Sequence, residues 1–346
     1  MKTVTLDAHS GESQMAVVME TGEVVYETRV ETTREALRRA VGSVTGPKRV
    51  VYEEGPLSAM IHDALKDVAD EVVSCDPTRN ALIATAEDSS DERDARRLAM
   101  LHRLGATHRV HVVEEPYRTL RSLVHHDYKR AQDVTRVKNQ IKALFRRWGI
   151  RVRGAGVYRA AGRREMRKEL PSGRVRWQLD SLGRLLDAFR LERLRAQRMI
   201  AKQARPIGAV KRLKTIPGMG PKTTPAIVAW IAGPERFKSR NALSSYAGLG
   251  LKQDVTHWEM VGRAHASKRG NRELKRALLL AARGTLKGTS ALRRRYDARR
   301  EAGWEDRKAI RDIARTILFI ACAIWQKRRE YDDAKVKVPV TEHGAR

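Results

Sequence analysis

The sequence contains few cysteines and no long apolar segment. Cys75 and Cys322 are the only two cysteines among the 346 residues. Two such widely separated thiols supply neither a disulfide framework nor a zinc site, so we interpret both as ordinary core residues. No run approaches the ~18 apolar residues that a membrane-spanning helix needs. The chain opens directly on strand-like sequence without a basic and apolar leader. We therefore expect a soluble cytoplasmic protein without a membrane partner.

Acidic residues are scarce outside the first hundred positions. Residues 1–100 contain 12 Lys and Arg against 19 Asp and Glu, a net charge of −7, whereas the whole chain carries +29. The remaining 246 residues therefore carry +36. A charge of this size repels itself unless an anionic partner is near, which excludes a neutral metabolic enzyme and favours nucleic acid as the partner. The asymmetry suits a metal-dependent enzyme that acts on a polyanion, and the alternative is a regulator with an acidic dimerisation domain.

The first hundred residues alternate between strand-like and helix-like patterns. Strands are predicted at 2–7, 14–19, 24–30, 49–53 and 71–75, and helices at 33–41 and 57–68. Gly22 is expected to turn the second and third strands into a hairpin. Three strands, then helix, strand, helix and strand, is the order of an RNase-H-like α/β fold.

A long amphipathic helix is predicted over residues 116–150, because apolar residues recur three, four or seven positions apart. They are Leu120, Val124, Ala131, Val134, Ile141, Leu144 and Trp148. A partner helix is indicated after Pro171-Ser172-Gly173 by Leu179, Leu182, Leu186 and Phe189. The pair predicts a helical hairpin or coiled coil. The other faces of the first helix carry Lys129, Arg130, Arg136, Lys138, Lys142, Arg146 and Arg147. These basic residues are either the solvated face of a dimerising stalk or a contact with nucleic acid.

A second compact domain is predicted from about residue 206. It ends with a helix that has Ile313, Ile317, Ile320 and Ile324 on one face. The last fifteen residues are expected to be frayed.

Four carboxylates follow the predicted strands of the first domain. Asp7 ends the first strand, Glu53 ends the fourth, and Asp91 and Asp94 share one face of a helix opening. In an RNase-H-like sheet the first and fourth strands are neighbours, so the four side chains can converge. Such a cluster repels itself unless it holds divalent cations. Two Mg²⁺ (or Mn²⁺) ions ~4 Å apart can activate the attacking oxygen and stabilise the leaving oxygen of a phosphodiester. Taken singly, each carboxylate also has a structural explanation, for example at a helix N-terminus.

The segment from Leu213 to Thr223 has the pattern of a helix-hairpin-helix. Its Pro-Gly-Met-Gly turn lets the backbone approach a phosphate, and N–H groups at the start of the second helix would face the anion. The candidate nucleic-acid contacts here are Lys214, Gly218, Gly220, Lys222 and Thr223. The alternative is a tight turn between helices without a ligand.

These segments, in this order, resemble the transposases of the insertion sequence 110 family and the related Piv-type DNA invertases. The resemblance covers nearly the whole chain. It rests on Leu6-Asp7, Tyr52-Glu53-Glu54-Gly55-Pro56, Asp91 to Ala95, Ile216 to Gly220, Arg236-Phe237, Tyr246 to Leu249, and Ser267 to Asn271 followed by Leu274 and Ala277. The resemblance implies a RuvC-like catalytic domain over 1–114, a coiled-coil region over 115–205, a mostly α-helical transposase domain with the helix-hairpin-helix over 206–330, and a tail over 331–346. It also implies a DEDD metal site formed by Asp7, Glu53, Asp91 and Asp94, with Glu53 preferred to Glu54 by its spacing.

The family is thought to attack DNA with a serine of the small domain, and the corresponding position here holds Thr256. A threonine hydroxyl can attack, although its methyl group hinders the approach and restricts rotation. Ser267 is the less favoured substitute, because its segment is better explained as a phosphate-binding turn. That turn adds Lys268, Arg269, Asn271 and Arg272 to the candidate nucleic-acid contacts. Ser89-Ser90 stands where the family commonly has a Lys-Thr pair.

The leading hypothesis is a transposase or site-specific recombinase of a mobile element, acting on DNA as a homo-oligomer, dimer or tetramer. It would lie on the nucleoid when bound to DNA. Some members of the family are guided by a structured RNA, which makes such an RNA a candidate partner. One alternative is a metal-dependent nuclease or resolvase that activates water without a covalent step. The other is a non-catalytic, domesticated nucleic-acid-binding protein.

Overall fold

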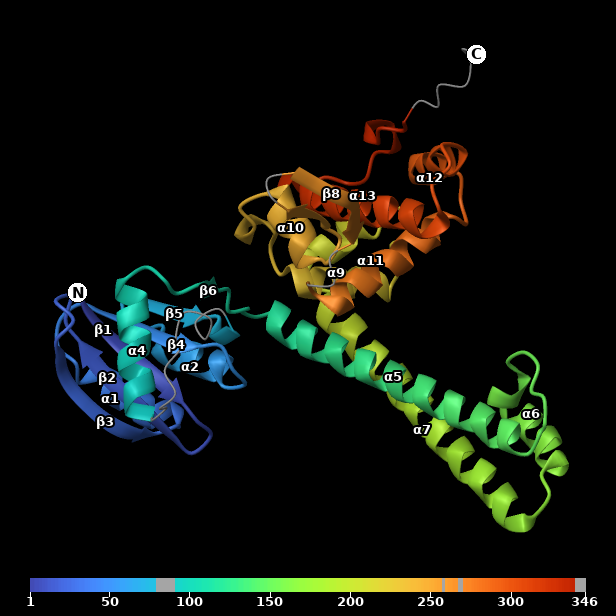
Figure 1. Ribbon diagram of the computed structural model, residues 1–346, viewed down its shortest axis with the longest axis horizontal. Helices are drawn as coiled ribbons and strands as arrows, with labels where there is room; N and C mark the ends of the chain where they lie inside the picture. The colour runs from blue at the N-terminus through green and yellow to red at the C-terminus, as the bar shows by residue number, and fades with distance from the viewer. Residues whose placement is uncertain (79–90, 257–258, 267–269, 340–346) are drawn as a thin grey trace. The chain divides into compact units, whose positions relative to one another are not determined.

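The computed structural model describes residues 1–78, 91–256, 259–266 and 270–339 (Figure 1). Of residues 91–92, 251–256 and 259–266 the backbone alone is described. The chain divides into two compact units, Met1–Val113 and Glu114–Arg346, which are treated separately below. Within the described residues, no helix combines the length and the apolar character needed to cross a membrane.

The first unit is built on a six-stranded mixed sheet in the order β3-β2-β1-β4-β5-β6. The strands are β1 Lys2–Ala8, β2 Glu12–Val18, β3 Val24–Glu31, β4 Lys48–Glu53, β5 Glu71–Cys75 and β6 Arg109–Val110. β1 pairs antiparallel with β2 and parallel with β4, which pairs parallel with β5. The elements predicted up to residue 75 are confirmed, with boundaries that differ by up to three residues. Gly22 has φ 97° in the β2–β3 turn, a conformation that glycine adopts readily.

Helices cover both faces of this sheet. α1 (Arg34–Gly42) and α2 (Ser58–Leu65) pack on one face, where Leu6 and Tyr52 are fully buried. α4 (Asp91–Arg103) covers the other face and lies in front of the sheet in Figure 1. Cys75 is buried beneath it, beside Val51 and Leu98, so its predicted role as a core residue is confirmed.

The second unit is mostly helical. Its helices are α5 Tyr117–Arg147, α6 Ala160–Met166, α7 Gly173–Ala204, α8 Gly208–Leu213, α9 Thr223–Ile231, α10 Arg240–Tyr246, α11 Arg272–Thr285, α12 Ala291–Glu301 and α13 Asp306–Lys327. Short 3₁₀ segments lie at Gly156–Tyr158, Arg167–Glu169, Pro234–Arg236 and Asp333–Lys335. β7 (Leu251–Thr256) and β8 (Glu259–Ala266) form an antiparallel hairpin. That hairpin was not predicted, because residues 257–258 that connect its strands are His-Trp rather than a Gly- or Asn-containing turn pair.

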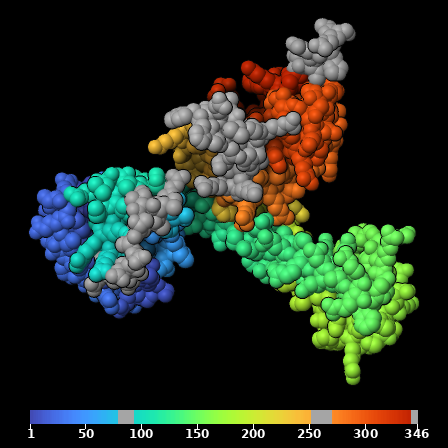
Figure 2. Space-filling view, in the orientation of Figure 1, coloured from blue at the N-terminus to red at the C-terminus, as the bar shows by residue number. Residues whose placement is uncertain are grey.

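The predicted pair of long helices is confirmed as a helical hairpin. α5 and α7 pack along their length, as Figure 1 shows, and their atoms form one continuous arm in Figure 2. α7 begins where the break was expected, with the Ser172 hydroxyl accepting from the N–H of Val175 (3.4 Å). Of the apolar residues predicted to face the partner helix, Trp148 is the exception, since it is 47% exposed. It lies just past the last residue of α5, where the chain leaves the helix axis.

The base of this hairpin is part of the core of the second unit. Leu120 of α5 and Ala204 of α7 pack in one cluster with α9, α11 and α13. Ile313, Ile317 and Ile324 of α13 are buried there as predicted, and Cys322 is buried beside them. Ile320 is only partly buried. The long hairpin is thus part of the helical core and is not joined to it by a linker alone.

Candidate active site and nucleic-acid interface

Two of the predicted carboxylates lie at adjacent positions at one end of the sheet. β1 and β4 run parallel with Leu6 opposite Tyr52, so Asp7 and Glu53 are the next pair in register. Leu6 and Tyr52 face α1 and α2, and side chains alternate along a strand, so the pair that follows points to the α4 face. Asp7 is half-buried and Glu53 is exposed. The Nε2 atom of His9 lies 3.3 Å from a carboxylate oxygen of Asp7.

The direction of α4 brings its first residues to the same end. Near the helix C-terminus, Arg103 donates to the carbonyl of Thr21 in the β2–β3 turn (3.1 Å). In the middle of the helix, Leu98 packs on β4 and β5. Since the C-terminus of α4 lies beside the N-terminal end of β1, its N-terminus lies toward the C-terminal ends of β1 and β4. Asp91 and Asp94 occupy that N-terminus.

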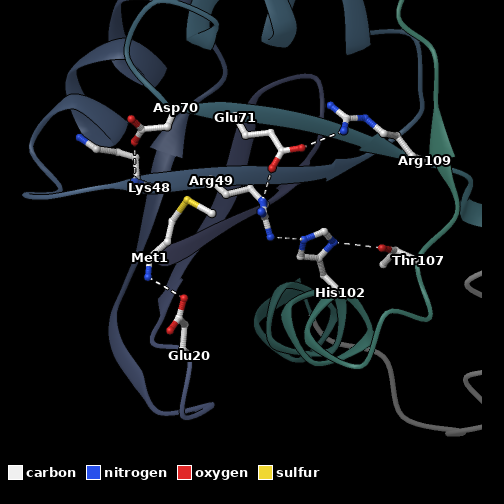
Figure 3. Close-up of polar contacts among 9 residues, drawn as sticks. All are labelled: Met1, Glu20, Lys48, Arg49, Asp70, Glu71, His102, Thr107 and Arg109. Atoms are coloured by element: carbon white, nitrogen blue, oxygen red, sulfur yellow. Dashed lines mark hydrogen bonds and ion pairs between the residues drawn. The ribbon is translucent and has the colours of Figure 1, made fainter. Parts of the chain in front are cut away.

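A polar network fixes the other end of α4 to the sheet (Figure 3). Arg49 of β4 donates to Glu71 of β5 (2.5 Å) and to Nε2 of His102 (3.1 Å). Nδ1 of His102 in turn donates to the hydroxyl of Thr107 (3.0 Å), which makes this imidazole neutral. Burial, and then the charge of Arg49, lowers the pKa of His102. Although partial burial opposes the effect, Arg49 and Arg109 hold the pKa of Glu71 below its ordinary value.

The four predicted metal ligands are described to different extents. Asp94 is half-buried and lies 3.5 Å from Arg97, one turn further along α4. The side chain of Asp91 lies outside the described residues, as do Ser89 and Ser90. Among the described residues, no group of three or more His, Cys, Asp or Glu side chains is close enough to hold a metal ion. The structure therefore brings the backbones of the four acidic residues to one end of the sheet.

The turn between α8 and α9 uses its two glycines differently. Gly218 has φ 82°, and a Cβ added there would collide with the carbonyl oxygen of Ala281 and lie 2.8 Å from the N–H nitrogen of Thr285. Gly218 is thus required for close packing against α11. Gly220 has open space around it, and its N–H donates to the hydroxyl of Thr223 (2.9 Å). Lys214 and Lys222 are exposed on either side of the turn.

The β7–β8 hairpin that carries Thr256 is closed at its base by two glycines. A Cβ added at Gly270, which has φ 106°, would lie 2.6 Å from Cα of Gly248. The N–H of Asn271 donates to the carbonyl of Tyr246 (2.7 Å). Thr256 is opposite Glu259 at the far end of this hairpin, and its side chain is outside the description.

The residues that leave the hairpin have mixed roles. Oδ1 of Asn271 accepts from the N–H of Leu274 (2.8 Å) and so caps α11. Arg272 is exposed on the first turn of that helix. Ser267, Lys268 and Arg269 lie outside the described residues. Of this predicted contact set, Arg272 is the member whose described side chain faces solvent.

The Arg236-Phe237 motif also has a structural role. Arg236 donates to the carbonyls of Ile231 (2.8 Å) and Trp230 (3.1 Å) at the end of α9. Its guanidinium also lies over the rings of Phe237 (4.3 Å) and Tyr246 (4.6 Å). The motif therefore holds the end of α9 against α10. A basic residue just after a helix is the sequence signal for such a cap.

Comparisons with known proteins match both units. One family model, described as a transposase of the DEDD type of IS110, matches residues 4–149, and a second, for the transposase IS116/IS110/IS902 family, matches residues 210–297. Together they cover about two thirds of the chain. This chain belongs to the IS110 family of transposases. The first match includes all four predicted carboxylates, and the second includes the α8–α9 turn and Thr256.

Individual proteins are also similar over part of the chain's length. The insertion element IS110 uncharacterized 43.6 kDa protein of Streptomyces coelicolor is 30% identical over 139 residues, which are 40% of this chain and 34% of that protein. The pilin gene-inverting proteins of Moraxella lacunata and Moraxella bovis are each 30% identical over 121 residues, 35% of this chain and 38% of theirs. The chain thus spans about a third of the length of the curated relatives it matches.

Proposed function

We propose that the chain is a DNA transposase or site-specific recombinase of a mobile element, with its phosphodiester chemistry at the carboxylate end of β1 and β4. The observation that carries the proposal is the register of the sheet, which makes Asp7 and Glu53 neighbours at the C-terminal ends of parallel strands. The N-terminus of α4, with Asp94, points to the same end. The proposal extends the family membership to an activity of this chain.

The order of the strands supports an RNase-H-like, RuvC-like identity for this unit. β3, β2 and β1 are antiparallel neighbours, and β4 and β5 continue the sheet parallel to β1. Residues 1–114 would then be the catalytic domain, residues 115–205 the helical arm, and residues 206–330 the transposase domain, with 331–346 as a tail. The described part of the tail is held in place, because Arg295 donates to the carbonyl of Lys337 (2.7 Å).

The carboxylates have the donor chemistry of a hard divalent cation. Asp7, Glu53, Asp91 and Asp94 would supply only oxygen ligands, which suits Mg²⁺ or Mn²⁺. The bound cations would polarise the phosphodiester and stabilise the leaving oxygen. The chain's own part is to bring these side chains together from two strands and one helix. The hydrogen bond between Arg49 and His102 fixes the C-terminal end of α4 to the sheet. It would hold the helix in place while the carboxylates converge on the cations.

Thr256 is the proposed nucleophile. Its hydroxyl oxygen would form a bond to phosphorus while the bond from phosphorus to a sugar oxygen breaks. The hydroxyl proton would pass to solvent or a nearby base, and the departing sugar oxygen would take up a proton. Gly248 and Gly270 position the hairpin by clamping its base. Energy kept in the protein–DNA bond would allow rejoining to a second strand.

DNA is the proposed substrate, and exposed cations of the second unit would bind its phosphates. Lys214, Lys222 and Arg272 are suited to this by their exposure. Lys268 and Arg269 are proposed from their positive charge in the sequence. The basic faces of α5 offer a surface for a structured guide RNA. We also propose a homo-oligomer, dimer or tetramer, and a cytoplasmic location on the nucleoid.

One experiment separates the candidate functions. The full chain, purified with its bound nucleic acid, is incubated with Mg²⁺ and supercoiled DNA that carries the flanking ends of its element, then denatured. The proposal expects a protein–DNA adduct that maps to Thr256 and is lost in Thr256→Ala. Asp7→Asn and Glu53→Gln should lose strand cleavage, whereas Glu54→Gln, a carboxylate beside the same sheet end, should keep it.

Other outcomes identify the alternatives. Metal-dependent cleavage without an adduct would favour a nuclease that activates water, for which the hindered threonine is the motivating observation. Binding without any cleavage would favour a domesticated nucleic-acid-binding protein. If Glu54→Gln lost cleavage while Glu53→Gln retained it, the ligand assignment would move by one residue.

A further inference from the structure

A pocket of about 370 Å³ lies between α13 and the segment that follows it. The residues of α13 that line it recur at three, four and seven positions, so they form one face of the helix. They are Thr316, Phe319, Ile320, Ala323, Ile324 and Lys327. The opposite wall is the stretch from Arg329 to Val336, and Arg240 at the start of α10 completes the rim. Apart from Arg240, the lining residues lie beyond the segments that the family models match.

The pocket combines an apolar floor with cations at its rim. Arg240, Lys327 and Arg329 line it, and within the described part of the chain none of the three forms an ion pair. The guanidinium of Arg240 lies 5.5 Å from the ring centre of Phe319. The remaining cation, Lys335, is paired with Asp332 (2.9 Å). Glu330 also lines the pocket, but the three cations without an ion pair outnumber this carboxylate. An occupant should therefore have a flat apolar part for the floor and negative charge for the rim.

The outer wall of the pocket is fixed to the rest of the unit. The N–H of Tyr331 donates to the hydroxyl of Thr215 (2.9 Å), and the phenol of Tyr331 donates to Asp333 (2.7 Å). Asp333 in turn accepts from the N–H of Ala291 at the start of α12 (2.8 Å). The pocket is thus preformed, and its wall is bonded directly to the α8–α9 turn that carries Lys214. The outer wall of the pocket therefore lies beside the proposed nucleic-acid interface.

We propose that this pocket binds one unstacked nucleobase of a single-stranded segment of DNA or RNA, with the flanking phosphates on Arg240, Lys327 and Arg329. The base would lie on the apolar floor beside Phe319, as bases stack on aromatic rings in single-strand-binding proteins. The volume falls in the range of about 300–1,000 Å³ that small-ligand pockets occupy. The proposal rests on the proposed function for the presence of nucleic acid. It also explains why Ile320 is only partly buried, because this side chain forms pocket floor as well as core.

The test isolates the base from the phosphates. Binding of the full chain is measured for a short duplex with a three-nucleotide single-stranded overhang and for the same duplex with abasic sites in the overhang. Both probes have the same charge, so the ratio of their dissociation constants reports base contacts alone. In the wild-type protein the abasic probe should bind roughly 5- to 150-fold more weakly, the effect of losing one stacked base. The measurement is made with DNA and with RNA overhangs to identify which nucleic acid supplies the unstacked base.

Two variants remove the base site while leaving the rim charges in place. Phe319→Leu removes the ring but keeps an apolar side chain, and Ala323→Phe fills the pocket. Both should bring the ratio close to one. Leu280→Phe is the matched control, because Leu280 is an exposed apolar residue of α11 outside this pocket (51% exposed). It should keep the wild-type ratio, and circular dichroism confirms that each variant is folded.

A photo-cross-link locates the base. An overhang that contains 4-thiothymidine, or 4-thiouridine in RNA, should cross-link to the peptides that contain Phe319 or Tyr331. Equal binding of the two probes by the wild-type protein would overturn the inference and leave the proposed function standing. A cross-link confined to other peptides, with the ratio unchanged in Phe319→Leu, would also overturn it. Failure to bind either probe at low salt would instead count against the proposed function.

Discussion

Family motifs lie both at the carboxylate end of the first unit and in the glycine-rich turns of the second unit. The motif residues have different roles in the two places. Asp7 and Glu53 follow the buried part of their strands, and the core beneath them is complete with Leu6 and Tyr52. In the second unit, Gly218 and Gly270 are placed where a single added carbon would collide with neighbouring backbone. The first pair can be changed without opening the core, whereas the glycines cannot.

The motifs of one family thus include residues proposed to act in the reaction and residues needed for folding. A carboxylate at a strand end contributes little to packing, so the proposed function gives it a role in the reaction and not in the fold. A glycine in contact with another backbone is required for folding, whether or not the exposed residues beside it bind nucleic acid. Variants in the second unit should therefore lower stability, and variants at the sheet end should lower activity at nearly constant stability.

The largest effect is expected for Gly218→Ala. The added Cβ would collide with the carbonyl of Ala281, and a residue other than glycine is strained at φ 82°. Overpacking and backbone strain together should lower the free energy of unfolding by about 2–5 kcal/mol. Urea denaturation followed by circular dichroism measures the change. Gly220→Ala is the matched control two residues away, and it should stay within about 0.5 kcal/mol of the wild type because its surroundings are open.

A smaller effect is expected for Asp312→Asn on α13. Asp312 is buried and lies 2.8 Å from Arg295 and 3.3 Å from Arg299. Burial alone would raise its pKa, but the hydrogen bond and charge of Arg295, followed by Arg299, outweigh burial and lower it. Loss of the carboxylate at pH 7 should lower the free energy of unfolding by about 1–3 kcal/mol, less than for a fully buried pair because the arginines are partly exposed.

The pH dependence of this effect has a definite sign. Because the folded pKa of Asp312 lies below the ordinary value of 3.8, its stabilisation is complete above that pH and is lost as the pH falls through the folded pKa. The difference in the free energy of unfolding between the wild type and Asp312→Asn should therefore disappear at acidic pH. Asp297→Asn is the control, since the ion pair of Asp297 with Arg293 is exposed and solvent screening should make its contribution smaller than that of Asp312. A gap that is constant down to pH 2 would contradict the role given to the charge.

Sequence periodicity predicted the first unit well because its strands are short and bounded by clear signals. Glu71–Cys75 was predicted at the observed bounds, and the helix after Thr33 begins where its hydroxyl caps it. The spacing of Asp7 and Glu53 from their strands was enough to place both at one sheet end. The distance that separates their carboxylates from Asp94 depends on side-chain torsions and on bound cations, which no pattern encodes.

The second unit was predicted less completely because its key contacts join residues far apart in sequence. The packing of Gly218 against Thr285 of α11 leaves no local signature, so the sequence predicted a phosphate contact or a tight turn at this glycine but not its contact with α11. The capping role of Asn271 could have been recognised, since asparagine three residues before a leucine opens many helices. The rim of the α13 pocket was missed because Arg240 and Lys327 belong to separate elements.

A smaller pH effect of the same sign, but at higher pH, is expected from His102 in the first unit. Burial, with help from Arg49, lowers its pKa below 6.5, so the folded protein binds a proton less readily than the unfolded chain. The stabilisation is complete above pH 6.5 and is lost as the pH falls from 6.5 through the folded pKa. His102→Gln keeps an acceptor for Arg49 and a donor for Thr107 but cannot titrate. The Tm of the wild type should therefore fall relative to that of His102→Gln as the pH is lowered from 7.5 to 5. If the two proteins showed the same dependence of Tm on pH, the neutral imidazole would be contradicted.

The smallest change in stability is expected at the carboxylate end itself. Asp7→Asn keeps the shape of the side chain and removes negative charge from the end of β1, where Glu53 is the neighbour in register. Its free energy of unfolding should stay within about 0.5 kcal/mol of the wild type, or rise slightly, because two neighbouring carboxylates repel each other without a bound cation. Added Mg²⁺ should raise the Tm of the wild type and not that of Asp7→Asn, since a ligand that binds only the folded state stabilises it. A stability loss as large as that of Gly218→Ala, with no response of the wild type to Mg²⁺, would show that Asp7 belongs to the architecture and that the two regions do not differ as proposed.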